Sequence, residues 1–221
     1  MPGPIAVIGG TGEEGSGLAL RWAVAGFEVI IGSRDADRAA TAAQQIADRA
    51  SSGKVSGLAN PDAAAAAAVI VVAVPYSGQA DIYKSIASHI PDDGIVVDCT
   101  VPIAAGVGAK ATHTLGVWEG SAVQQAQAFV PKGTKLVGAF HSLAAVALND
   151  LDSTLEGDVL TCGSKAGKAV VKELVEAIPD LRYVDAGPLD MARIIEPLTA
   201  LLIGINHRYK TDRAGIKITG I

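Results

Sequence analysis

The first residues of the chain join a short apolar run to a glycine-rich segment. Ile5 to Ile8 are all apolar, and Gly10-Thr11-Gly12-Glu13-Glu14-Gly15 follows almost at once. A helical pattern over residues 15–26 comes next, so the segment predicts the strand, turn and helix that open a βαβ unit. In such a unit the first glycine, Gly10, permits the tight turn, Gly12 leaves room for a pyrophosphate, and Gly15 lets helix and strand pack closely. The free amides and positive dipole end of the helix N-terminus attract phosphate.

Strand-like apolar runs recur along the chain and alternate with helical patterns. The runs over 69–74 and 94–98 are continuously apolar, which is typical of strands buried on both faces of a parallel sheet. The alternation predicts an α/β fold of Rossmann type, with a doubly wound, mostly parallel sheet. We expect strands near 4–9, 27–32, 54–58, 69–74, 94–99 and 134–139, and helices near 15–26, 36–51 and 76–89.

The pattern changes after about residue 139. We expect strands near 157–162 and 181–186, a helix near 164–178, and a long apolar helix over 190–206 with a kink at Glu196-Pro197. These segments predict two domains, a dinucleotide-binding Rossmann domain over 1–138 and a smaller α/β domain over 139–221. Residues 100–120 are rich in Gly, Ala and Pro and are expected to form a functional loop.

The end of the second predicted strand indicates which dinucleotide binds. Sites for NAD place Asp or Glu there, about 20 residues past the glycines, whereas this chain has Ser33 and Arg34. A guanidinium binds a 2′-phosphate through parallel hydrogen bonds, and Arg38 faces the same way if a helix begins near Asp35. We therefore predict NADP(H). The alternatives are that Arg38 is a solvated helix-face charge, and that Asp35 or Asp37 pairs with these arginines.

Two further groups of residues follow predicted strands, where the ligand crevice of such sheets lies. Val74-Pro75 and Val101-Pro102 each end an apolar run, and they either line the nicotinamide end of the crevice or simply terminate strands. His141 follows the strand over 134–139 and is either a structural histidine or a group that positions a ring or carbonyl. No metal-ligand or hydrolase spacing is present, which favours chemistry carried by the cofactors, without an essential proton donor.

Composition excludes several classes of protein. The net charge of −5 argues against nucleic acid as a partner, and no run of about 18 apolar residues predicts a membrane span. The N-terminal apolar run lacks the basic leader of a signal peptide. Cys99 and Cys162 have no metal-binding or redox-motif spacing, so we expect buried thiols in a cytoplasmic protein.

These motifs together resemble one known family, the NADPH-dependent reductases of the deazaflavin coenzyme F420, or F420H2:NADP+ oxidoreductases. The resemblance extends over nearly the whole chain, and its middle and C-terminal motifs are the most specific. It rests on Gly9-Gly-Thr-Gly12, Ile31-Gly-Ser-Arg34, Val72-Ala-Val-Pro75, Val97-Asp-Cys-Thr-Val-Pro102, Ala139-Phe-His-Ser-Leu143, Asp185-Ala-Gly-Pro-Leu189, Glu196-Pro-Leu-Thr199 and Ala214-Gly-Ile-Lys217.

The resemblance implies reversible hydride transfer between NADP(H) and coenzyme F420 as co-substrate. It implies that Thr11, Ser33, Arg34 and Arg38 hold NADP, the last three around the 2′-phosphate. It further implies that the C-terminal domain completes the F420 cleft and that its helices form a homodimer. The cleft residues that it implies are His141, Leu143, Ala145 and Ala214.

Two other functions keep the NADPH site. One is reduction of a small ketone, imine or 2-hydroxy acid, for which Lys132 or Lys135 would have to supply a proton donor although both lie in a turn-like stretch. The other is a redox sensor that binds NADPH without turnover. Mixing NADPH with oxidised F420 distinguishes the three.

Overall fold

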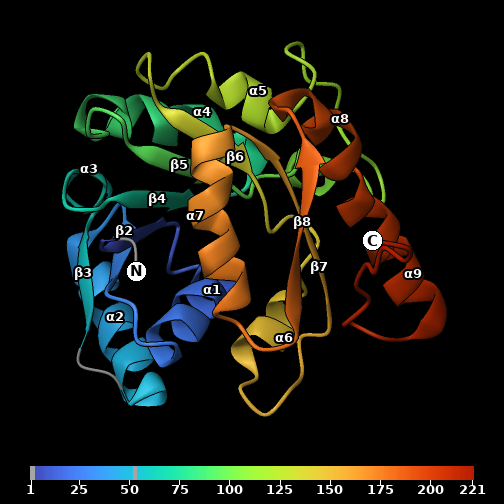
Figure 1. Cartoon of the computed structure of the whole chain (residues 1–221), viewed down its shortest axis with the longest axis horizontal. Helices are drawn as coiled ribbons and strands as arrows, with labels where there is room; N and C mark the ends of the chain where they lie inside the picture. The colour runs from blue at the N-terminus through green and yellow to red at the C-terminus, as the bar shows by residue number, and fades with distance from the viewer. Residues whose placement is uncertain (1–2, 52–53) are drawn as a thin grey trace.

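The computed structural model describes residues 3–51 and 54–221, and within them one eight-stranded sheet forms the centre of the molecule (Figure 1). All neighbouring strands run parallel except β6 and β7, which confirms the predicted α/β Rossmann-type fold with a mostly parallel sheet. In spatial order the strands are β3 (Val55–Ala59), β2 (Val29–Ser33), β1 (Ile5–Ile8), β4 (Val69–Val72), β5 (Ile95–Asp98), β6 (Lys135–Gly138), β7 (Gly157–Gly163) and β8 (Leu181–Gly187).

Helices cover both faces of this sheet. The α-helices are α1 (Glu13–Val24), α2 (Ala36–Ala50), α3 (Asn60–Ala65), α4 (Tyr76–Ile86), α5 (Ala122–Ala126), α6 (Ala145–Asn149), α7 (Lys165–Glu176), α8 (Ala192–Ile195) and α9 (Leu198–Tyr209). Short 3₁₀ helices are η1 (Ala87–His89), η2 (Ala104–Val107) and η3 (Leu189–Met191). None of the helices in the described residues is long and apolar enough to cross a bilayer.

The long helix expected over 190–206 is interrupted rather than kinked. The helix α8 follows the 3₁₀ helix η3 and ends at Ile195, whereas α9 begins at Leu198. Glu196 and Pro197 therefore lie between two separate helices. Proline lacks the amide hydrogen that a continuous helix needs, which explains the interruption. Figure 1 shows α9 at the edge of the molecule, beyond β7 and β8.

Alternate residues of the strands point into two cores, one on each face of the sheet. Ile5 and Val7 belong to a core with α1, α2 and α7, whereas Ala6 and Ile8 belong to a core with α3, α4 and α5. This is the pattern expected of strands buried on both faces.

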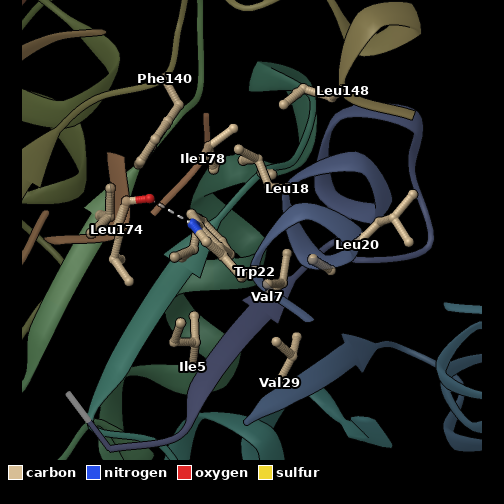
Figure 2. Close-up of a cluster of buried hydrophobic side chains, with 14 of the residues drawn as sticks. Ile5, Val7, Leu18, Leu20, Trp22, Val29, Phe140, Leu148, Leu174 and Ile178 are labelled. Carbon is tan, nitrogen blue, oxygen red and sulfur yellow. Dashed lines mark hydrogen bonds between the residues drawn. The ribbon is translucent and has the colours of Figure 1, made fainter. Parts of the chain in front are cut away.

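Trp22 on α1 links the two halves of the chain in the first core (Figure 2). Its indole Nε1 donates a hydrogen bond to the Leu174 carbonyl at 3.0 Å, and its ring packs edge-on to Phe140 with the centroids 5.6 Å apart. The boundary predicted at residue 138 therefore falls inside one continuous sheet and core, between the paired strands β6 and β7. The division into domains over 1–138 and 139–221 stays a prediction.

Candidate functional site

The glycine-rich turn allows the start of α1 to pack closely against the ends of β1 and β4. Gly9 has the left-handed backbone conformation, with φ +84°, and a Cβ there would lie 2.3 Å from the carbonyl oxygen of Ala73. The residue that gives this turn its conformational freedom is thus Gly9, and not Gly10 as predicted. A Cβ on Gly10 would instead lie 2.8 Å from the Val7 carbonyl oxygen, and one on Gly15 would lie 2.5 Å from that of Gly9. Gly15 therefore has the predicted role of allowing close packing of helix on strand.

Gly12 has a different role, because it faces open space. Its hypothetical Cβ would meet only the Gly9 carbonyl oxygen, at 3.3 Å. Gly12 is the N-cap of α1, and no side chain caps that helix end in the described residues. The uncapped amides and the missing side chain form a cradle that fits a pyrophosphate.

A cavity of about 370 Å³ lies beside this cradle, at the ends of β2 and β4, and it gathers most of the predicted phosphate-binding residues. Ser33 is buried at the end of β2, whereas the guanidinium groups of Arg34 and Arg38 are exposed. Seven of the residues predicted for the site line this cavity, namely Thr11, Gly12, Ser33, Arg34, Arg38, Val74 and Pro75.

The acidic neighbours do not neutralise these arginines. Asp35 caps α2 instead, because its Oδ1 accepts hydrogen bonds from the backbone amides of Asp37, at 2.9 Å, and Arg38, at 3.1 Å. Across residues 3–51 and 54–221, no ion pair involves Arg34 or Arg38. Two unpaired cations beside a serine hydroxyl fit a phosphate monoester.

A second cavity, of about 430 Å³, adjoins the first. The two share Gly12, Ala73, Val74, Pro75 and Ser77, so they form one continuous cleft along the carboxyl ends of the parallel strands. The other predicted residues found here are Glu13, Val101, His141, Leu143 and Ala145. Small and apolar side chains predominate among them, which suits flat rings held away from water.

His141 is a buried polar residue of this second cavity. Its side chain is only 4% exposed, and within the described chain neither ring nitrogen has a hydrogen-bond partner of normal geometry. Burial lowers the pKa of His141 to about 4, although the backbone of Asp98 opposes part of the shift. The imidazole is therefore neutral near pH 7. Its backbone carbonyl accepts a hydrogen bond from the Thr199 hydroxyl at 2.7 Å, which ties α9 to the cleft.

Three predicted residues line neither cavity of the cleft, and one of them is Gly15, which packs against the carbonyl oxygen of Gly9. Gly10 borders a separate hollow between α1 and α2, together with Gln45 and Arg49. Ala214 follows α9, where its amide donates to Asn206 Oδ1 at 3.0 Å, and among the described residues it lines neither cavity of the cleft.

Several cleft residues were missed from the sequence. Asn60 is 3% exposed and borders the first cavity, and its Oδ1 has no hydrogen-bond partner in the described residues. Its position directly after a strand was a usable signal. Glu14, Cys99 and Thr199 line the second cavity, and of these only Glu14 lies inside the glycine motif.

The fold and the cleft together define a dinucleotide-binding protein of the Rossmann class. Residues 4–102 match the family model described as NADP oxidoreductase coenzyme F420-dependent. The F420-dependent NADP reductase of Methanothermobacter thermautotrophicus is 43% identical over an alignment of 221 positions. The alignment covers 98% of this chain and 95% of the relative. The F420-dependent NADP reductase of Methanothermobacter marburgensis is 40% identical, with 98% of each chain covered.

A solved structure from Arthrobacter sp. FB24, described as a candidate F420-dependent NADP-reductase, superposes with a TM-score of 0.82. Its sequence is 25% identical, and the match covers 98% of this chain and 99% of that chain. The chain belongs to the F420-dependent NADP reductase family.

Proposed function

We propose that this protein transfers a hydride reversibly between NADP(H) and the deazaflavin coenzyme F420. The observation that carries the proposal is the continuity of the cleft. One end presents Ser33, Arg34 and Arg38, and the other is a small-residue cavity containing the neutral His141. Full-length relatives named F420-dependent NADP reductase support the choice of the second substrate.

The first cavity is the proposed site for the adenosine end of NADP(H). The 2′-phosphate would lie against Arg34 and Arg38, with the Ser33 hydroxyl as a further donor. The pyrophosphate would lie at Gly12, where the α1 amides are uncapped. A carboxylate at the end of β2, as in sites for NAD, would repel that phosphate instead.

The second cavity is the proposed site of hydride transfer. The bound nicotinamide and deazaflavin supply the redox chemistry themselves. The protein has to hold two flat rings with their reacting carbons about 3–3.5 Å apart and to exclude water. Val101, Leu143 and Ala145 provide apolar walls, and the uncharged His141 orients a ring or a carbonyl group rather than transferring a proton.

A direct assay tests this function. The protein is mixed with NADPH and oxidised F420, and the deazaflavin absorbance is followed. We expect the absorbance to fall with NADPH and far more slowly with NADH at the same concentration. NADPH oxidation by ketones or imines but not by F420 would instead indicate a carbonyl or imine reductase. Tight NADPH binding with no turnover of any of these substrates would indicate a sensor.

We also propose that the protein acts as a cytoplasmic homodimer. Cys99 and Cys162 are both buried and unpaired, which suits a reducing compartment. Leu201 and Tyr209 on α9 are 58% and 73% exposed, and an uncovered apolar helix face is typical of a subunit interface. The resemblance to the family supports the same helix as the contact.

A further inference from the structure

Glu14 is an acidic side chain in the apolar part of the cleft. It is the second residue of α1 and lines the cavity that holds His141, Cys99 and Val101. Its Oε1 is completely buried and has no hydrogen-bond partner among the described residues. A buried carboxyl oxygen without a hydrogen-bond partner lowers the stability of the folded protein. Protonation of the carboxyl group or contact with a ligand reduces this cost.

The charge environment of Glu14 favours the protonated acid. Burial is the main cause and the negative charge of Asp98 adds to it, so that the pKa of Glu14 is raised to about 8. Glu14 is therefore mostly neutral at pH 7, which also limits its repulsion of a pyrophosphate at the same helix end.

Of the other titratable groups that line the cavity, Cys99, Tyr76 and His141 do not change charge near neutral pH, and Glu13 is exposed. Burial keeps the pKa of Cys99 well above its usual range, that of Tyr76 is raised, and that of His141 is about 4.

Outside the cavity lining, burial raises the pKa of Asp98 and raises that of Glu196 to about 7, and the Glu14→Gln comparison below separates their titration from that of Glu14. Asp98 lies at the end of β5 and does not border the cavity among the described residues. Its oxygens accept hydrogen bonds from Tyr83, at 2.6 Å, Gln79, at 2.8 Å, and the Thr100 amide, at 2.8 Å.

We propose that Glu14 is a redox-linked proton site of the cleft, which keeps its proton beside the reduced nicotinamide and releases it to solvent when oxidised NADP+ binds. The inference rests on the proposed function insofar as NADP(H) is the ligand. The oxidised nicotinamide ring carries a positive charge and the reduced ring does not. A cation in the same water-poor cavity favours the carboxylate, so the O–H bond of Glu14 breaks and the proton passes to water.

Linkage makes the effect reciprocal. If the pKa of Glu14 is lower in the NADP+ complex than in the NADPH complex, raising the pH between those two values strengthens NADP+ binding relative to NADPH binding. A difference of one pKa unit between the complexes corresponds to about a tenfold change in the affinity ratio. The pyrophosphate and the 2′-phosphate are common to both nucleotides, so their effects cancel in that ratio.

The experiment is a pair of calorimetric titrations, with NADP+ and with NADPH, at pH 7 in phosphate and in Tris buffer. The dependence of the heat on the buffer ionisation enthalpy gives the number of protons released. We expect NADP+ to release up to about one proton more than NADPH. Between pH 6 and 9 the dissociation constant of NADPH divided by that of NADP+ should rise by about tenfold or more.

Two variants assign the proton. Glu14→Gln keeps the size and polarity of the side chain but has no proton to lose, so the difference between the two nucleotides should disappear. Glu173→Gln removes the same formal charge from an exposed position on α7 that borders neither cavity, and the difference should remain. Circular dichroism and thermal unfolding establish that both variants are folded.

Three outcomes overturn the proposal: equal proton release with both nucleotides, an affinity ratio that is constant from pH 6 to 9, or a difference that survives in Glu14→Gln. The first two use only the unsubstituted protein and hold even if Glu14→Gln does not fold. Nucleotide binding without F420 reduction would contradict the proposed function alone. Failure to bind either nucleotide would overturn both.

Discussion

At the scale of single residues, the proposed basis of nucleotide choice is the pair of cations at the end of β2. Arg34 borders the first cavity and no described residue forms an ion pair with it, so its guanidinium is available to a phosphate. We predict that Arg34→Gln weakens NADPH binding by about 10- to 100-fold, because a charge-assisted hydrogen bond contributes roughly 1.5–3 kcal/mol. NADH has no 2′-phosphate, and its weak binding should change little.

Fluorescence titration with both nucleotides measures this effect. Lys172→Gln on α7 is the matched control, since it removes one exposed positive charge far from the cleft in sequence. Among the described residues, the ion-pair partner of Lys172 is Glu176 on the same helix. An equal loss of NADPH and NADH affinity in Arg34→Gln would show that the arginine supports the local structure and does not read the phosphate.

Residues whose positions follow from the spacing of a local motif could be predicted from the sequence. Ser33, Arg34 and Arg38 were identified because the glycine motif fixes how far away the end of β2 must lie. Glu14 and Asn60 were missed because neighbours distant in sequence bury Asn60 and the Oε1 atom of the partly exposed Glu14. The positive φ of Gly9 rather than Gly10 depends on how closely the turn approaches the carbonyl of Ala73, which no local pattern encodes.

At the scale of secondary-structure elements, Arg21 fastens α1 to α6. Its side chain is 8% exposed, and it donates hydrogen bonds to the carbonyls of Leu148, at 2.9 Å, Ala147, at 2.8 Å, and Ser153, at 3.2 Å. The last carbonyls of a helix lack partners within the helix, so a guanidinium at the C-terminal end of α6 satisfies them. Because α6 begins with Ala145, this contact also positions one wall of the cleft.

We predict that Arg21→Leu lowers the free energy of unfolding by roughly 2–3 kcal/mol, because it leaves buried carbonyls without donors. Urea denaturation followed by circular dichroism measures the loss. The free energy of unfolding of Arg21→Lys should lie between those of the unsubstituted protein and Arg21→Leu, since an ammonium cannot reach all of these carbonyls at once. Lys172→Leu makes the same kind of replacement at an exposed helical position and should cost little. If both leucine variants lost similar stability, the hydrogen bonds to α6 would not be the cause.

The predicted strands and helices agree best with the observed ones where burial produces a strong local pattern of apolar residues. The continuously apolar runs at β4 and β5 were placed within two residues of their observed ends. The segment over 100–120, for which the sequence predicts a loop and no regular element, contains the short 3₁₀ helix η2 and one isolated bridge between Ile103 and Thr114. A bridge of that kind depends on contacts between distant residues and leaves no periodic pattern in the sequence.

At the scale of the whole molecule, one sheet joins the two predicted domains. The antiparallel pairing of β7 with β6 extends the nucleotide-binding sheet into the C-terminal part. The domain boundary at residue 138 is predicted because the βα alternation ends there. The local pattern could not show that the next strand returns to the same edge. The cleft is consequently built from both halves, with Thr199 of α9 bonded to the backbone of His141.

At the same scale, α9 is a helix with large apolar side chains that a single chain leaves exposed. Only Ala200 and Leu202 of this twelve-residue helix are buried, while Leu201 between them is 58% exposed. We predict that the protein sediments at twice its chain mass of 22.4 kDa and that Leu201→Lys shifts it to the monomer. A lysine buried at a subunit contact without a partner would cost several kcal/mol.

Analytical ultracentrifugation over a range of concentrations measures this shift. Val24→Lys is the control, because Val24 is 52% exposed at the end of α1 and the substitution has the same chemistry. The control should remain dimeric. A monomeric unsubstituted protein, or a dimer unaffected by Leu201→Lys, would place the subunit contact elsewhere or remove it. Because Thr199 connects α9 to His141, dissociation should also weaken F420 turnover more than NADPH binding, which the absorbance assay and a parallel nucleotide titration would separate.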